Sequence, residues 1–215
     1  MNLDRLAQEF RERFDTKMTA RERALPSARK AIRSSANAIR AIHRGDREQA
    51  HRLMDEARAA LDEGAAAVEG HPDVGFAGFL QDAQKEYVEA RITELVVDGS
   101  SELPSPDDLG VQLAPYLNGM AEAIGEARRH ILDLLRQGEV QRSEAMLLAV
   151  EDIYGVLVSM DYPDAITGNL RRSTDVARSI MEKTRGDLSI SLVQRDLRDA
   201  LDRHAREIRG DAPST

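Results

Sequence analysis

The chain has 215 residues with a formal net charge of −8, and 41% of them are hydrophobic, 32% charged and only 4% aromatic. This length suits one large domain or a domain with extensions, and the apolar content excludes a disordered chain. The absence of cysteine excludes disulfides, zinc fingers and thiol nucleophiles, and it favours a reducing, cytoplasmic location.

Membrane targeting is not expected. No run of about 18 apolar residues is present, so no membrane partner is predicted. The first ten residues, MNLDRLAQEF, carry charges where a signal peptide needs an apolar stretch. Because the chain is net acidic, any nucleic-acid binding must come from a local basic surface.

The first third of the chain predicts three helices and a loop. Residues 2–18 place leucine and phenylalanine at helical spacing. Pro26 interrupts this pattern and is best placed in the first turn of a second helix, which runs to about Arg44. Gly45 and Asp46 then end that helix and begin the third. The apolar stripes of the second and third helices comprise Ala28, Ile32, Ala36, Ile39 and Ile42, and Ala50, Leu53, Met54, Ala57 and Leu61. Residues 64–78 predict a loop with little stable structure.

The remainder of the chain also predicts helices separated by loops. The segment 98–108 is dense in Gly, Ser, Pro and Asp and is the clearest loop. Beyond Gly186 we expect a short peripheral helix over residues 193–208, followed by the frayed tail GDAPST. The long helices are predicted over residues 79–97, 115–136, 140–160 and 170–183.

These elements predict an all-α fold. No stretch alternates apolar and polar residues for long enough to require a strand, and short loops between helices indicate an antiparallel bundle of about six to seven helices. No repeat of 20–50 residues, P-loop, GxGxxG, GxSxG or HExxH motif is present, which excludes several classes of enzyme.

Two pairs of glutamates are the candidate chemistry. Glu86 and Glu89 are three residues apart and Glu122 and Glu126 are four apart, so each pair shares one helix face. If the two helices face each other, four carboxylates converge, and an all-oxygen cluster prefers Mg²⁺ or Mn²⁺. Such an ion would activate water for attack on a phosphodiester. The ordinary alternative is that both pairs belong to solvated helix faces.

Small and polar residues accompany the second pair. Asn118, Glu122, Glu126 and Arg129 form a polar stripe on one helix. Gly119 and Gly125 beside it would let a partner helix or a nucleic-acid strand approach closely.

Arginines supply the candidate nucleic-acid surface. Their contacts to phosphate would give salt-dependent, sequence-tolerant binding, whereas the ordinary alternative is a solvated face paired with nearby glutamates. Arg128 and Arg129 directly follow the second acidic pair and are placed to hold a substrate backbone. The other candidates lie on or near the second predicted helix and are Arg21, Arg23, Arg29, Lys30, Arg33, Arg40 and Arg44.

The aromatic and histidine residues allow more than one interpretation. Tyr87 and Tyr116 could stack on a base, although tyrosine at helix interfaces more often packs. His130 has the spacing of a metal ligand, but a phosphate contact or a surface position is more common. His43 and His51 are expected at the surface or between helices.

Several segments resemble the translin family. The segments QKEYVEA and YLNGMAEAIGEARR are similar to stretches of its catalytic branch, translin-associated factor X. SARKAIRSSANAIRAIHRGD resembles the first long helix of the family, and DIYGVLVSMDYPDAITGNLRRSTDVARSIMEKTRGDLSIS resembles its C-terminal helices. The similarity covers roughly residues 20–191, so we expect a translin-like helical domain over residues 1–191 and a peripheral helix and tail over 192–215.

The resemblance also implies roles for residues. The catalytic acids of the family fall on Glu86, Glu89, Glu122 and Glu126, which would bind Mg²⁺ or Mn²⁺. Glu122 stands where the family has Asp, one methylene shorter. Since translin itself lacks this acidic set, the chain looks nearer the catalytic branch, as an archaeal-type homologue.

Assembly is implied in the same way. Members of the family form closed octameric barrels around nucleic acid, so the resemblance implies single-stranded RNA, with single-stranded DNA as a further ligand, and other copies of the chain as partners. A subunit interface could then use Ile153, Val156, Leu157, Val158 and Met160, which could instead complete the core of one subunit.

Three functions compete. The first is a metal-dependent endoribonuclease acting on single-stranded RNA, and the second is a non-catalytic shell that binds single strands. The third, a carboxylate-bridged redox bundle, is disfavoured because neither acidic pair has a histidine three residues on.

Overall fold

The computed structural model describes residues 3–209, which form eight helices and no strand. This confirms the all-α prediction. Their bounds are α1 Leu3–His43, α2 Arg47–Ala67, α3 Pro72–Gly75, α4 Phe79–Asp98, α5 Leu113–Gln137, α6 Val140–Ser159, α7 Asp164–Thr167 and α8 Leu170–Arg209. Within this range, every helix falls short of the apolar length that crossing a bilayer requires. The tail GDAPST lies outside the described residues.

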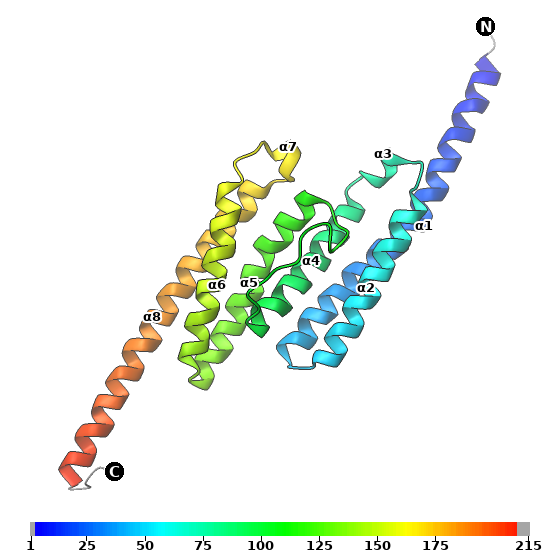
Figure 1. The fold of residues 1–215 in the computed structure, drawn as a ribbon. Coiled ribbons are helices and arrows are strands. Elements are labelled where there is room, and N and C mark those ends of the chain that lie inside the picture. The colour runs from blue at the N-terminus through cyan, green and yellow to red at the C-terminus, as the bar shows by residue number, and fades with distance from the viewer. Residues whose placement is uncertain (1–2, 210–215) are drawn as a thin grey trace.

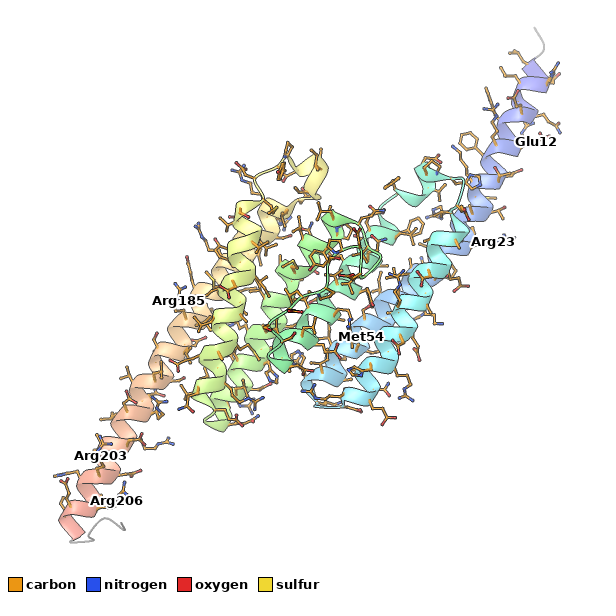
Figure 2. All side chains as sticks on the ribbon, in the orientation of Figure 1. Glu12, Arg23, Met54, Arg185, Arg203 and Arg206 are labelled. Carbon is orange, nitrogen blue, oxygen red and sulfur yellow. The ribbon has the colours of Figure 1, made fainter. Side chains whose placement is uncertain are left out.

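The long helices form an elongated bundle (Figure 1). α1 packs on α2 and α4, α4 packs on α5, and α5 packs on both α6 and α8. The N-terminal part of α1 and the C-terminal part of α8 project from opposite ends of the bundle (Figure 1). Figure 2 shows the side chains of Arg203 and Arg206 near the end of the α8 projection, where both are exposed.

The predicted apolar stripes form the core. Ala28, Ile39 and Ile42 of α1 are buried, and so are Met54 and Leu61 of α2. Alanines are frequent among the buried residues of α1 and α2, and their small side chains allow the two helices to pack closely where they face each other. On α6, Ile153 and Leu157 are buried in the core of the subunit, whereas Val156 and Val158 are exposed.

The prediction of a new helix at Pro26 was wrong. α1 runs without interruption from Leu3 to His43, with Pro26 inside it. Proline removes one backbone hydrogen bond, which frees the carbonyl of Glu22 four residues earlier. Both residues are exposed, so water can satisfy that carbonyl.

The predicted break after Gly186 was also wrong, because α8 is continuous from Leu170 to Arg209. One glycine in a helix costs only about 1 kcal/mol. Thr184 and Leu188 on either side of Gly186 are buried, so packing holds the helix together there. The boundary proposed between residues 191 and 192 stays a prediction.

The segment 64–78 is more ordered than predicted. α2 continues to Ala67, and α3 adds one turn at Pro72–Gly75. Gly64 is buried within α2, where a Cβ would lie 2.8 Å from Leu80 Cδ2 of α4.

Candidate metal centre

Three of the four predicted acids converge between α4 and α5. One oxygen from each of Glu86, Glu89 and Glu122 can be chosen so that all lie within 4.8 Å of one another. Glu86 and Glu89 come from α4 and Glu122 from α5, as their spacing predicted. All three side chains are partly buried.

Gly119 allows this convergence. A Cβ at Gly119 would lie 2.7 Å from the carbonyl oxygen of Lys85 and 2.7 Å from Val88 Cβ, both on α4. Only a glycine permits so close an approach of the two backbones. The predicted role of Gly119 in admitting a partner helix is therefore confirmed, and that helix is α4.

Burial and neighbouring negative charges raise the pKa of two of the acids. Burial, followed by the charges of Glu122, Glu86 and Glu126, raises the pKa of Glu89 to about 8. Burial also raises the pKa of Glu86, although the nearby ammonium of Lys85 opposes this. Of these acids, Glu89 is therefore the one that favours its protonated form most strongly.

Lys85 is a member of the site that we did not predict. Its Nζ lies 2.6 Å from Glu122 Oε1 and 3.7 Å from Glu86 Oε1. Burial lowers the pKa of Lys85, but the hydrogen bond and charge of Glu122 and the other acids outweigh this and raise it. Its place directly before Glu86 in the sequence was the only available signal.

Glu126 is paired with His43 and is not one of the three acids that converge within 4.8 Å. Its Oε2 lies 2.5 Å from Nε2 of His43, at the end of α1, and 3.9 Å from Arg129 Nη1. The hydrogen bond with His43 is the main reason that the pKa of Glu126 is lowered. His43, whose side chain is 4% exposed, was expected only as a surface or interhelix residue.

His130 lies beside His43, with ring centroids 6.3 Å apart. Burial, then the charge of His43, lowers the pKa of His130. His130 as a whole is partly buried, with its Nε2 buried, so it lies between helices at the edge of the bundle. Within residues 3–209, the side chains that converge closely enough to hold a metal ion are those of the three glutamates, and His130 is not among them.

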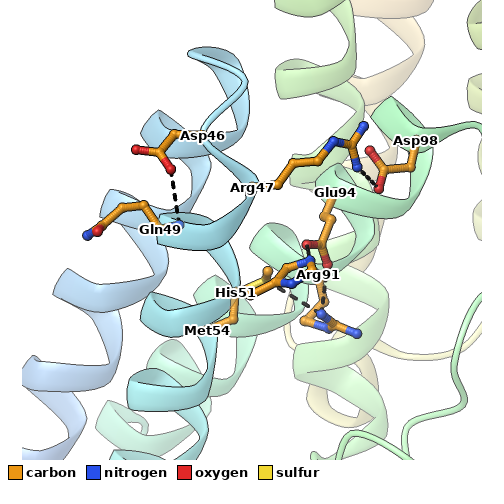
Figure 3. Close-up of polar contacts among 8 residues, drawn as sticks. All are labelled: Asp46, Arg47, Gln49, His51, Met54, Arg91, Glu94 and Asp98. Atoms are coloured by element: carbon orange, nitrogen blue, oxygen red, sulfur yellow. Dashed lines mark hydrogen bonds and ion pairs between the residues drawn. The ribbon is translucent and has the colours of Figure 1, made fainter.

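A second polar cluster, on the other side of α4, is structural. Glu94 is buried, and its carboxylate lies 2.7 Å from both Arg91 Nη1 and His51 Nε2 (Figure 3). Arg47 pairs with Asp98 one turn further along α4 (Figure 3). These contacts join α2 to α4, and they place His51 at the surface between the two helices.

Asn118 of the predicted polar stripe on α5 and Arg128, predicted to hold a substrate backbone, make structural contacts as well. Asn118 is buried, donates to the carbonyl of Thr167 at 2.8 Å and accepts from Ser173 Oγ at 2.7 Å, so it does not reach the acids. Arg128 donates to Thr184 Oγ1 at 3.0 Å and to Asp187 Oδ2 at 2.7 Å, which ties α5 to α8.

The tyrosines pack rather than stack. Tyr87 is buried in the core, and Tyr116 is buried with its hydroxyl donating to the carbonyl of Pro104 at 2.6 Å. The ordinary interpretation of both residues is confirmed.

The basic residues of α1 remain at the surface. Arg21 pairs with its neighbour Glu22, and Arg40 donates to Asn37. Arg23, labelled in Figure 2, lies where α1 leaves the bundle. In the described part of the chain no ion pair occupies Arg23, Arg29, Lys30, Arg33 or Arg44, all of which are exposed.

Known proteins are similar to this chain over most of its length. No family model matches the chain. An uncharacterized protein of Methanocaldococcus jannaschii is 31% identical over 192 residues, which cover 87% of this chain and 83% of that protein. The crystal structure of AfC3PO, an archaeal translin-like protein, has a TM-score of 0.80 and 32% identity, and the match covers 88% of this chain and 98% of AfC3PO.

The chain belongs to the translin family. A structure of AfC3PO in complex with duplex RNA matches equally, at a TM-score of 0.79 and 32% identity over 88% of this chain and 97% of AfC3PO. Apo-NeC3PO, at 22% identity and a TM-score of 0.71 over 88% of this chain and 97% of NeC3PO, shares the translin fold. The placement near the catalytic branch of the translin family stays a prediction.

Proposed function

We propose that this translin-family protein binds RNA and cleaves single strands at a Mg²⁺ or Mn²⁺ centre formed by Glu86, Glu89 and Glu122. The observation that carries the proposal is the convergence of their oxygens within 4.8 Å. Three hard oxygen donors without sulfur or imidazole fit a hard divalent cation. The raised pKa of Glu89 fits it too, since a cation would neutralise the same crowded charge.

Each residue then has a defined part. Glu86, Glu89 and Glu122 would ligate the ion, and Glu89 would give up its proton on binding. Glu126, fixed by His43, adds a carboxylate charge beside the three ligands. Arg129, which is exposed next to Glu126, is placed to contact a substrate phosphate. A bound ion would supply an activated water and positive charge toward the scissile phosphate.

Two observations support RNA binding. A structure of AfC3PO in complex with duplex RNA is known, and this chain is 32% identical to it. Arg29, Lys30 and Arg33 form an exposed basic strip on α1 that could contact phosphates. The preference for single-stranded RNA, with single-stranded DNA as a further ligand, comes from the family resemblance.

A non-catalytic RNA- or DNA-binding shell is the second candidate. The position of Lys85 favours it, because an ammonium already balances part of the charge of Glu122 and Glu86. In this case the acids would only be structural.

We further propose a closed homo-oligomer, an octamer as in the family, in a cytoplasmic location. An apolar row on the projecting part of α1, formed by Leu6, Phe10, Phe14 and Met18, is exposed in one subunit and would be covered in an assembly. Light scattering on the purified protein would measure the number of subunits.

Cleavage of a labelled single-stranded RNA in Mn²⁺ tests the nuclease. We expect the wild type to cleave, and Glu89→Gln and Glu122→Gln to lose about 100-fold or more in rate while still binding RNA. Glu144→Gln, at an exposed position on α6, is the matched control. Cleavage by Glu89→Gln and Glu122→Gln at the wild-type rate would overturn the metal centre at these acids, whereas no cleavage by any of the proteins, with RNA binding retained, would leave the non-catalytic shell as the function.

A further inference from the structure

Lys85 places a cation among the same carboxylates that are proposed to bind metal. Its Nζ is 2.6 Å from Glu122 Oε1 and 3.7 Å from Glu86 Oε1. Two of the three proposed ligand residues therefore already share one ammonium. The third, Glu89, senses the charge of Lys85 as well.

A divalent ion and this ammonium cannot occupy the site together at low cost. Their repulsion at a given distance is twice that of two single charges, and it is poorly screened in a partly buried site. An ion bound to Glu122 would also take the oxygen that accepts the hydrogen bond of Lys85. Metal binding therefore requires the ammonium to move.

The side chain of Lys85 is able to move. It is 26% exposed, so a path to solvent exists. The lysine ammonium is strongly hydrated and sits on a flexible four-carbon stem, which allows it to leave an ion pair without losing all its hydrogen bonds. Its backbone, by contrast, is fixed against Gly119.

We propose, on the basis of the metal centre proposed above, that Lys85 is a tethered counter-cation that a divalent ion must displace. Lys85 thus lowers the affinity of the site for metal and sets the metal concentration at which the site fills. In the absence of metal, it limits the repulsion among Glu86, Glu89 and Glu122 and so stabilises the crossing of α4 and α5.

A different role for Lys85 would change the metal affinity of the site in the opposite direction. If the lysine instead oriented Glu122 for ligation, its removal would weaken metal binding. The direction of the change in affinity therefore separates the two roles.

Titration of Mn²⁺ into the purified protein, followed by electron paramagnetic resonance, measures this directly. We expect Lys85→Met to bind Mn²⁺ about tenfold more tightly than the wild type. Lys85→Arg keeps the charge and should not gain affinity. Lys183→Met removes an exposed charge from α8 and should bind as the wild type does.

The outcomes are distinguishable. Equal or weaker binding by Lys85→Met, with binding by the wild type, would overturn the role of Lys85 and leave the metal centre standing. No binding by either protein at millimolar Mn²⁺ would overturn the metal centre, and this inference with it. Lys85→Gln serves in place of Lys85→Met if circular dichroism shows that the latter is unfolded.

Discussion

The carbonyl oxygen of Lys85 and the α-carbon of Gly119 lie against each other where α4 crosses α5. A Cβ on Gly119 would be 2.7 Å from that oxygen and would also meet Val88. The neighbouring residues, Glu86 on one helix and Glu122 on the other, contribute to the carboxylate cluster. The backbone contact and the candidate site are therefore parts of one feature.

Gly119→Ala should force the two helices apart. We expect a loss of about 1–3 kcal/mol in the free energy of unfolding, because the backbone oxygen cannot move aside as a flexible side chain can. Urea denaturation measures this. Gly155→Ala on α6 is the control, since no atom lies within 4 Å of its Cβ position, and it should be neutral or slightly stabilising. Equal stability of the two variants would argue against the close crossing.

The sequence predicted the three central helices well, but it did not predict that the first and last helices are continuous. Apolar periodicity depends on burial along each helix, so α4, α5 and α6 lie within two residues of their predicted bounds. The sequence predicts a helix boundary at Pro26 and at Gly186 because the local propensity of each residue opposes a helix. In the folded chain, exposure of Pro26 and packing on both sides of Gly186 overcome that propensity.

Part of the site was predictable for a similar reason. A spacing of three or four residues places side chains on one face of a helix. This was enough to predict Glu86, Glu89 and Glu122 as candidate residues of one site. It could not show that Glu126 turns toward His43, because that contact joins residues 83 apart in the chain. Nor could it separate Arg128, which is tied to Asp187, from exposed Arg129.

The raised pKa of Glu89 makes stability depend on pH. Its usual value is 4.5 and its value in the fold is about 8, so the folded protein holds an extra proton between these limits. The free energy of unfolding should therefore fall as pH rises through this window. Glu89→Gln cannot ionise and should be more stable than the wild type at pH 8.5 by roughly 2–4 kcal/mol, with no difference below pH 4.

Denaturation in urea at a series of pH values measures this dependence. Glu63→Gln, at an exposed position on α2, should follow the wild type. If Glu89→Gln showed the same pH dependence as the wild type, Glu89 would not carry the proton.

His43→Ala should destabilise the protein and free Glu126. The carboxylate would lose its hydrogen bond inside a partly buried space, which costs about 1–3 kcal/mol. The pKa of Glu126 should rise, because the bond with His43 is the main cause of its low value. His51→Ala is the comparison: His51 is 61% exposed, and its partner Glu94 keeps Arg91. Carbon NMR of the glutamate carboxyl groups would detect the change, and an unchanged Glu126 would contradict the contact.

Two groups of arginines should behave differently. Arg128→Ala removes bonds to Thr184 and Asp187 and should cost about 1–2 kcal/mol in stability. Arg29→Ala and Arg33→Ala should leave stability unchanged but weaken RNA binding, and each should reduce the salt dependence of binding by about one unit of slope. Fluorescence anisotropy over a range of salt concentrations measures the latter. RNA binding that is insensitive to both variants would place the binding surface elsewhere.

Anomalous X-ray diffraction from crystals grown with Mn²⁺ tests the central claim most directly. The metal centre predicts an anomalous peak bounded by carboxylate oxygens of Glu86, Glu89 and Glu122, with the ammonium of Lys85 moved away from Glu122. The claim would be contradicted by crystals in millimolar Mn²⁺ that show no peak between these residues and retain the contact of Lys85 with Glu122.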